Sequence, residues 1–198
     1  MTATITPWGY AIDGAIPDII TVAEFNVLTA NRFAADPMLS TTISAASAAI
    51  RDYCGWHVAP SATCIANVYG GSRLLHLPFR AVTSITKIEE NGVELDPSTY
   101  ALDPRGLGEI ARKGGFFWCG LNWNTITVTA VAGYDLTAVP MLTQAVVQLV
   151  SSAMAGPLGV KEEHAGQVGI TYANAGAGVT LTSSVCACLA PYRVEEVA

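Results

Sequence analysis

Cys54 and His57 stand three positions apart and are the best candidates for a reactive pair in this sequence. A thiolate beside an imidazole can act as a nucleophile, and cysteine and histidine together can hold zinc. Cys54, however, comes at the expected end of a helix, where the helix dipole raises the pKa of a thiol. There is no Cys-x-x-Cys pair, and an odd number of cysteines at these spacings matches no disulfide framework. We therefore expect reduced, buried thiols; the cysteines are Cys54, Cys64, Cys119, Cys186 and Cys188.

Two glycine-rich runs and two carboxylate pairs are the remaining candidates for a reactive site. Gly70-Gly71-Ser72 and Gly176-Ala177-Gly178 lack the strand-to-helix setting and the following lysine of a phosphate loop. Glu89-Glu90 and Glu162-Glu163 have no base, nucleophile or ligand set beside them in the sequence. We therefore expect a protein that is not an enzyme and that holds no cofactor and no metal.

The composition indicates a chain that covers its surface by association. Its 198 residues are 51% hydrophobic and only 13% charged, against about 25% charged in an ordinary soluble domain. No apolar run approaches the roughly 20 residues that span a bilayer, and the N-terminus shows no signal-peptide pattern. Burial in an oligomer is the simplest outcome. The net charge of -6 argues against a nucleic-acid-coating protein, but it does not argue against a ring through which DNA passes without being held.

The elements that must position any site begin with helices. Thr21 and Glu24 form a capping box, flanked by Ile20 and Phe25 as a hydrophobic staple, and predict a helix to about Ala34. The next helix is expected to run from an N-cap at Asp36, with Pro37 in its first turn, to a stop at Gly55. Its apolar stripe is Leu39, Ile43, Ala46, Ile50 and Tyr53.

A second long helix is expected from Val139 to the stop at Gly156-Pro157, and a short one from Leu181 to Leu189. The stripe of the long helix is Leu142, Ala145, Val146, Leu149 and Ala153. We expect these helices to pack into one small bundle.

Between residues 57 and 133 the hydrophobic period changes to two, which predicts an antiparallel β-subdomain. Asn91-Gly92 predicts a tight hairpin, and Asp103-Pro104-Arg105-Gly106 predicts a second turn. The expected strands are Cys64 to Tyr69, Leu74 to Leu77, Ile85 to Glu89, Val93 to Leu95, Tyr100 to Leu102, Glu109 to Ala111 and Thr125 to Val131.

These signals predict an α+β fold: a small helical bundle with an inserted antiparallel β-subdomain and an extended C-terminal strand and tail. The expected parts are an irregular N-terminal arm (1–20), a helical part (21–56), a β-rich insert (57–134), a long helix completing the bundle (135–157) and a C-terminal strand, short helix and tail (158–198). In the last part, Lys161 to Gly166 is expected to be a polar turn and Gln167 to Ala173 a strand.

Aromatic residues gather in two places. The loop Gly114 to Trp123 can be a contact surface for a protein or a sugar, or a lid over the open end of the β-subdomain, and we favour the lid. In the N-terminal arm, Trp8 and Tyr10 can anchor on another surface or pack locally.

Several motifs follow one another in an order that resembles the head-to-tail connector (head–tail adaptor) family of tailed phages. The likeness spans residues 21 to 193. The motifs are Ile43 to Trp56, which ends in Tyr-Cys-Gly-Trp, then Leu75 to Pro78 with Val82 to Ile85, Asn91-Gly92 with Tyr100 and Gly106, Val128 to Tyr134 with Pro140, and Gly166 to Arg193.

The resemblance implies a structural virion protein rather than an enzyme. Such proteins form a twelve-fold ring beneath the portal, extend the DNA channel and dock the next neck or tail component. The implied partners are other copies of the chain, the portal protein and the next neck or tail protein, with viral DNA passing through unbound and no membrane. The implied location is the virion neck, after synthesis in the bacterial cytoplasm. The candidate interface residues are Trp8, Tyr10, Trp118, Thr171, Tyr172, Tyr192 and Arg193.

Three alternatives remain open at this point. A neck or tail-terminator protein of the same virion would differ in ring symmetry and stacking position. A carbohydrate-binding module would need Trp118 and Trp123 exposed on one flat face. A cysteine-dependent hydrolase would need an accessible Cys54 or Cys119 beside a histidine.

Overall fold

The computed structural model describes residues 3–119, 126–155, 162–165, 168–171 and 179–194. The chain clusters into two compact units. The sheet unit comprises Met1–Pro17, Cys54–Ala138 and Tyr192–Ala198, and the helical unit comprises Asp18–Tyr53 and Val139–Pro191. Helices and antiparallel sheets together confirm the predicted α+β class.

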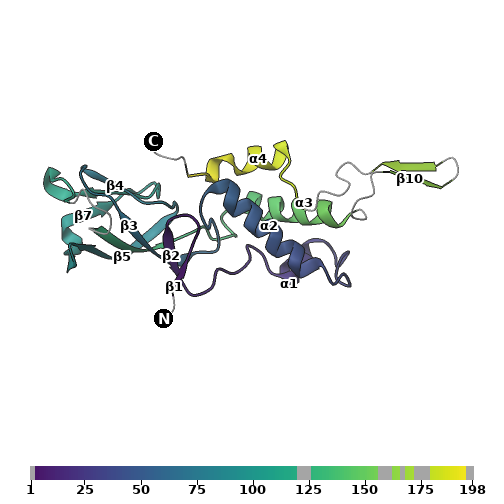
Figure 1. Cartoon of the computed structure of the whole chain (residues 1–198), viewed down its shortest axis with the longest axis horizontal. Helices are drawn as coiled ribbons and strands as arrows, with labels where there is room; N and C mark the ends of the chain where they lie inside the picture. The colour runs from purple at the N-terminus through teal and green to yellow at the C-terminus, as the bar shows by residue number, and fades with distance from the viewer. Residues whose placement is uncertain (1–2, 120–125, 156–161, 166–167, 172–178, 195–198) are drawn as a thin grey trace. The chain divides into compact units, whose positions relative to one another are not determined.

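The sheet unit is built on a six-stranded antiparallel sheet, in the order β1-β2-β3-β9-β5-β6 (Figure 1). Its strands are β1 (Ala3–Ile5), β2 (Tyr10–Asp13), β3 (Ala62–Val68), β9 (Ile126–Ala132), β5 (Val82–Glu90) and β6 (Val93–Glu94). On β9, buried residues alternate with half-buried ones, as the threonine pattern predicts. Asn91 and Gly92 both have positive φ and close the β5–β6 hairpin, which confirms the predicted turn.

A second, three-stranded sheet lies in the same unit, in the order β4-β8-β7. Its strands are β4 (Leu74–His76), β7 (Tyr100–Leu102) and β8 (Glu109–Arg112), with short 3-10 turns η1 (Pro97–Thr99) and η2 (Lys113–Gly115) beside them. The predicted turn between β7 and β8 is present, since the Gly106 N–H donates to the Asp103 carbonyl at 3.0 Å.

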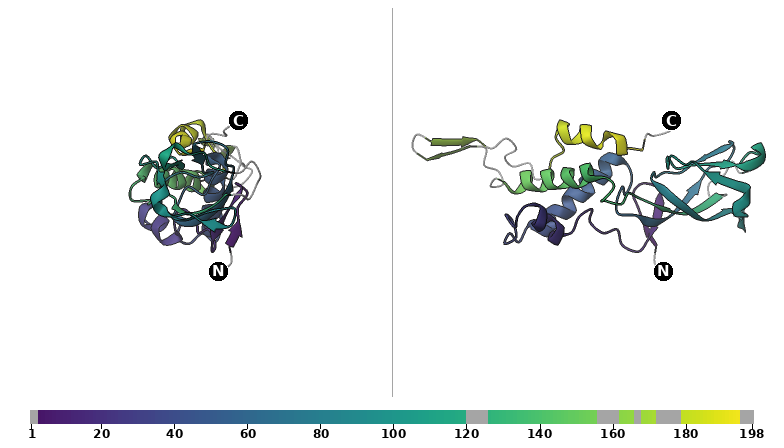
Figure 2. Two further views of the ribbon diagram at one scale, coloured as in Figure 1. Left: turned by 90° about the vertical axis from the view of Figure 1, so that its left-hand side faces the viewer. Right: turned by 180° about the vertical axis from the view of Figure 1, so that it is seen from behind.

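The helical unit contains α1 (Val22–Leu28), α3 (Pro140–Met154), α4 (Ser183–Leu189) and most of α2 (Leu39–Cys54). The capping box is confirmed: the Glu24 N–H donates to the Thr21 hydroxyl at 3.2 Å, and the Glu24 carboxylate accepts the Thr21 N–H at 2.7 Å. Figures 1 and 2 place α1 and α4 on opposite sides of this unit, with α2 and α3 between them. The remaining elements are the paired strands β10 (Glu162–Ala165) and β11 (Val168–Thr171) and the 3-10 turn η3 (Ala190–Tyr192).

The core of the helical unit comes from the predicted stripes. Leu39, Ile43, Ala46 and Ile50 of α2 are buried. The buried Ser47 hydroxyl accepts the Ile19 N–H at 3.0 Å, and the Tyr53 hydroxyl donates to the Cys186 carbonyl at 3.1 Å. These bonds tie α2 to the segment before α1 and to α4.

The expected irregular arm at residues 1–20 is wrong, because β1 and β2 extend the large sheet. β2 pairs with β3, more than fifty residues away in sequence, with Tyr10 opposite Ala66. Such a short strand is stabilised by this tertiary pairing, which local pattern does not contain.

Two helix boundaries also differ from expectation. The first helix ends at Leu28 instead of Ala34, because Ala30 and Asn31 have left-handed φ of 51° and 59°. α2 begins at Leu39, three residues after the expected N-cap, although the Asp36 carboxylate accepts the Met38 N–H at 2.8 Å, as the predicted cap does. The expected stop at Gly55 is confirmed by its φ of 76°.

The C-terminal part contains one further difference. The expected polar turn from Lys161 to Gly166 is wrong, since Glu162–Ala165 forms β10 and pairs with β11. The strand expected in Gln167 to Ala173 is confirmed as β11.

Candidate interaction surfaces

The Cys54 thiol is buried rather than reactive. Burial raises its pKa to about 12, although the Arg193 guanidinium acts in the opposite direction. Burial likewise raises the pKa of Cys64 to about 12. A thiol with such a pKa is protonated at neutral pH and is a poor nucleophile. The structure therefore contradicts the hydrolase alternative at Cys54.

His57 is committed to a structural network instead. Its Nε2 lies 3.0 Å from the Ala132 carbonyl, which can only accept, so Nε2 carries the proton of the neutral ring. Its Nδ1 then accepts from the Tyr10 hydroxyl at 2.8 Å, and the same hydroxyl accepts the His57 backbone N–H at 2.9 Å. The Cys64 sulfur is 3.9 Å from Nδ1, which Tyr10 already uses. The histidine thus joins β2 to β9 through buried hydrogen bonds.

Ring contacts connect three of the predicted interface residues, Trp8, Tyr10 and Tyr192, in one chain of aromatic side chains. The centroid distances are 6.2 Å for Trp8–Tyr10, 6.0 Å for Tyr10–His57, 5.2 Å for His57–Trp56, 5.8 Å for Trp56–Tyr134 and 5.3 Å for Tyr134–Tyr192.

This series of ring contacts connects the N-terminal segment of the sheet unit, at Trp8, with its C-terminal segment, at Tyr192. The buried Trp56 Nε1–H donates to the Tyr192 carbonyl at 2.6 Å, and the Val194 N–H donates to the Cys54 carbonyl at 2.9 Å. Tyr10 is buried, whereas Trp8 and Tyr192 are half-buried and Arg193 is exposed. The prediction that Tyr10 offers an interaction surface is therefore wrong, because its ring belongs to the core.

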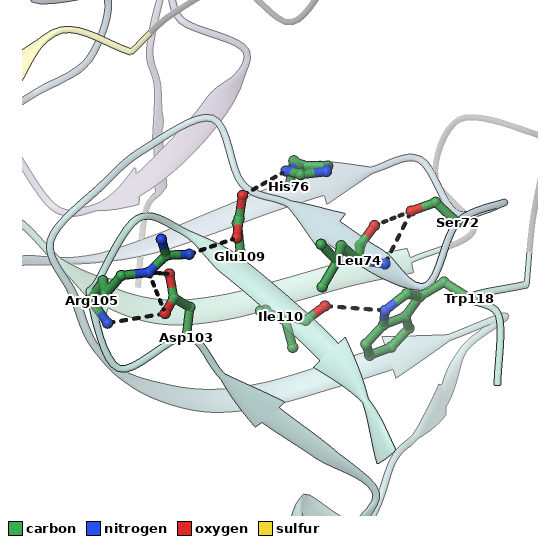
Figure 3. Close-up of polar contacts among 8 residues, drawn as sticks. All are labelled: Ser72, Leu74, His76, Asp103, Arg105, Glu109, Ile110 and Trp118. Carbon is green, nitrogen blue, oxygen red and sulfur yellow. Dashed lines mark hydrogen bonds and ion pairs between the residues drawn. The ribbon is translucent and has the colours of Figure 1, made fainter. Parts of the chain in front are cut away.

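Trp118 is also inside the protein, with only 1% of its surface exposed. Its Nε1–H donates to the Ile110 carbonyl at 3.3 Å (Figure 3). Its own backbone pairs with the loop before β4, since the Gly71 N–H donates to the Trp118 carbonyl at 2.7 Å and the Trp118 N–H to Ser72 at 2.8 Å. The prediction of an interface role for Trp118 is therefore wrong, and Trp118 does not supply an exposed indole of the kind that a carbohydrate module requires. Trp123 lies outside the described residues.

A partly buried ion pair supports this tryptophan. Arg112 Nη1 lies 3.0 and 3.1 Å from the two Glu90 carboxylate oxygens, and the arginine Cζ sits 5.3 Å from the Trp118 ring centroid. Glu90 also accepts the Cys119 N–H at 2.8 Å. β5, β8 and the aromatic loop are thereby joined at one point.

The residues just before Trp118 behave differently. Phe116 is 67% exposed and Phe117 58% exposed, and the Arg73 guanidinium lies 5.4 Å from the Phe117 ring centroid. Both interpretations of the aromatic loop thus find support. Trp118 is buried, as a lid requires, and Phe116 and Phe117 are exposed, as a contact surface requires.

A network of ion pairs lies on the three-stranded sheet and on the turn between β7 and β8 (Figure 3). Arg105 pairs with Asp103 at 3.1 Å and with Glu109 at 3.5 Å, and His76 Nδ1 lies 3.7 Å from Glu109. Hydrogen bonds from Arg105 hold the pKa of Asp103 below its usual range. Each carboxylate of this network already faces a cation or an imidazole.

Two predicted interface residues fall in or beside β11. Thr171 is its last residue, opposite Glu162 of β10 in the backbone register. Tyr172 lies outside the described residues.

The helical unit exposes apolar surface on α1. Val27 is 80% exposed and Leu28 54% exposed, whereas Phe25 on the same helix is fully buried. Sequence reasoning missed these two residues, although a signal existed: at about 100° per residue, Val27 points about 200° away from Phe25.

A shallow groove lies between α3 and α4 in the same unit. It encloses a cavity of about 60 Å³. Its lining residues are Met141, Gln144, Ala145, Gln148, Val185 and Cys188.

A metal site finds no geometric support in the part of the chain that the structure describes. Among those residues, no group of three or more histidine, cysteine, aspartate or glutamate side chains could hold a metal ion. Among the described helices, none has both the length and the hydropathy needed to cross a membrane. The arrangement instead offers apolar contact surfaces on a firmly packed frame.

Comparisons with known proteins point in the same direction. The family model described as "Head completion protein" matches residues 18–193. No curated protein matches the chain.

Six chains of solved structures match. One, from "Neck of empty GTA particle computed with C6 symmetry", has a TM-score of 0.63 and 20% identity over 96% of this chain and 97% of its own. Another, from "Neck of native GTA particle computed with C12 symmetry", has a TM-score of 0.61 and 18% identity over 100% of this chain and 98% of its own. These matches show that the fold as a whole is shared.

Proposed function

The chain belongs to the head completion protein family, and from that premise we propose that its copies close into a ring between the portal and the next neck or tail protein. Family membership confirms the head-to-tail connector role that the sequence resemblance implied, and with it a structural place in the neck of a virion. The ring, its copy number and its neighbours are the proposal.

The observation that carries the ring is the full-length likeness to neck chains. The match covers 100% of this chain and 98% of a chain whose structure is described as a neck with C12 symmetry. A fold shared from end to end, with both units included, supports the same manner of assembly. Twelve copies around one axis are the arrangement that this description suggests.

The surface of the helical unit supports assembly as well. A closed ring uses heterologous contacts, in which two different faces of each subunit meet. Obligate contacts of that kind are apolar. α3 and α4 contain no ionisable residue other than cysteine, and α1 exposes Val27 and Leu28 to solvent.

The role we propose is not enzymatic. The buried thiols Cys54 and Cys64 have raised pKa values, and His57 is engaged by Tyr10 and Ala132. The overall charge of -6 suits a channel that DNA traverses, because an acidic wall does not hold phosphate.

Sedimentation velocity of the full chain, alone and mixed with the portal protein of the same virus, tests the proposal. We expect a monomer or weak associations for the chain alone, and a complex with the portal that carries a ring. Twelve copies of the 20.7 kDa chain add about 250 kDa, which native mass spectrometry resolves from six copies. Failure of the mixture to co-sediment would overturn the proposed partner and place.

A further inference from the structure

We propose that in the ring the exposed α1 face, Val27 and Leu28, seats in the α3/α4 groove of the next copy. The α3/α4 groove is the hollow lined by Met141, Gln144, Ala145, Gln148, Val185 and Cys188. The proposal rests on the ring proposed above and identifies the two faces that close it.

The α1 face is a projection held from within its own unit. Phe25 is fully buried and its ring lies 6.1 Å from Phe33 in the turn after the helix. The Thr29 N–H and hydroxyl both donate to the Phe25 carbonyl, at 3.0 and 2.8 Å. With the inner side fixed in this way, Val27 and Leu28 are presented outward on a short, firmly anchored helix.

The α1 face also carries little charge. Glu24 is the single ionisable residue of α1, and its carboxylate is engaged by the Thr21 N–H and hydroxyl at 2.7 and 2.8 Å. An uncharged aliphatic projection at 80% exposure is costly to leave in water and suits an apolar receptor.

The receptor has the matching chemistry. α3 contributes the exposed Met141, Gln144 and Gln148, and the groove floor includes the buried Ala145 and Val185. Fifteen residues of α3 and seven of α4 contain no Asp, Glu, Lys, Arg or His. A cavity of about 60 Å³ has roughly the room of a few water molecules, comparable to a branched aliphatic side chain.

The positions of the two faces fit a ring and not a two-fold dimer. α1 and α4 lie on opposite sides of the helical unit, with α2 and α3 between them (Figures 1 and 2). A projection on one side and a groove on the other is what a heterologous contact needs, and repetition of such a contact around an axis closes a ring. A second copy of this chain is therefore the occupant that the geometry selects.

Cross-linking tests this contact directly, because Cys188 already lies in the groove. The variant is Val27→Cys in a chain that also carries Cys119→Ser and Cys186→Ser, treated with a short bismaleimide after assembly on the portal. We expect a ladder of covalent multimers up to the copy number of the ring, since each copy then has one thiol on each face. Adding Cys188→Ser should abolish the ladder.

Ile5→Cys is the matched control, because Ile5 is also aliphatic and is 85% exposed, but on β1. A ladder from the Ile5→Cys chain and none from the Val27→Cys chain would overturn the proposed contact. Cross-linked dimers alone would also overturn it, because they indicate a two-fold contact. If the wild-type chain forms rings but Val27→Cys gives no ladder, the contact fails and the connector ring stands. If the wild-type chain forms no rings, both fail.

A charge-reversal pair provides an independent readout. Val27→Glu should abolish rings on the portal without unfolding the monomer, because the side chain is largely exposed. Gln144→Lys in the same chain should restore them by placing an ammonium opposite the new carboxylate. Rings from Val27→Glu in wild-type amounts would contradict the contact.

Discussion

The sheet unit and the helical unit use their apolar residues in different ways. In the sheet unit, Trp56, Trp118 and Tyr10 are buried, and the polar atoms named for them have partners within the same unit. In the helical unit, α3 and α4 lack Asp, Glu, Lys, Arg and His, and α1 leaves the aliphatic side chains of Val22, Val27 and Leu28 in solvent. The first pattern is that of a self-sufficient frame, and the second is that of a surface made to be covered.

The contrast teaches where stability and assembly reside. Substitutions inside the sheet unit should change the free energy of unfolding, whereas substitutions on the α1 face should change association at nearly constant stability. The sheet unit also has exposed apolar side chains, with Ile5 at 85%, Phe116 at 67% and Val93 at 66% exposure. These residues mark places where the sheet unit can contact something other than itself.

The largest effect is expected for Trp56→Ala. The indole contacts the His57 and Tyr134 rings and donates a hydrogen bond to the Tyr192 carbonyl. Its removal leaves a cavity and an unpaired carbonyl, and should lower the free energy of unfolding by about 3–5 kcal/mol. Urea denaturation measures this difference. Trp8→Ala is the control, because Trp8 is half-buried at the end of the same chain of rings; an equal loss from both variants would contradict the frame description.

A smaller loss is expected for Arg112→Met, which breaks the pair with Glu90. The two side chains are 20% and 9% exposed, so the glutamate would be left with only part of its hydrogen bonding. We expect a cost of about 3 kcal/mol and a loosened aromatic loop, seen as a change in tryptophan fluorescence. Arg105→Met removes a pair in which the arginine is 68% exposed, and should leave the unfolding curve nearly unchanged. A larger loss of unfolding free energy for Arg105→Met than for Arg112→Met would contradict the view that the less exposed ion pair contributes more stability.

In the helical unit, Thr21→Ala removes the side chain that caps α1. We expect it to lower the free energy of unfolding by about 1 kcal/mol at neutral pH. Hydrogen bonds from the Thr21 backbone and hydroxyl lower the pKa of Glu24. A lowered carboxyl pKa gives stability that is present above the ordinary value and disappears as the pH falls through the lowered one. The cost of the substitution should therefore shrink below about pH 4. Thermal unfolding of both chains across this range measures it, and a cost that grows in acid would contradict the capping box.

The smallest change in stability is expected for Val27→Ser. Its side chain is largely exposed, so the free energy of unfolding should stay within about 0.5 kcal/mol of wild type. Ring formation on the portal should nevertheless weaken, which sedimentation detects. A destabilised monomer would show that the α1 face belongs to the core and would remove the contrast between the units.

The sequence was most informative where the signal is local. The capping box at Thr21, the Asn91-Gly92 hairpin and the alternation on β9 are set by neighbouring residues and appear as predicted. β1 and β2 escaped prediction because pairing with β3 stabilises them. The lid interpretation agrees with the burial of Trp118, but the pairing of its backbone with the loop at Gly71 could not be predicted, since that loop is distant in sequence.

The candidate interface residues show the same limit. Tyr10 and Trp118 were predicted as interface residues only because they are large and aromatic, and both are buried in the fold. Val27 and Leu28 are aliphatic residues of a short helix, and their exposure of 80% and 54% is seen only in the folded structure. Exposure, rather than residue type, distinguishes a binding face from a core, and exposure is set by tertiary packing.

The central claim, a connector ring in the virion neck, is tested most directly by a reconstruction of the neck without imposed symmetry. The account predicts twelve copies of this fold in a closed ring around the channel, with the portal on one side and the next neck or tail protein on the other. A neck without this chain, or with isolated copies that do not enclose the channel, would contradict it.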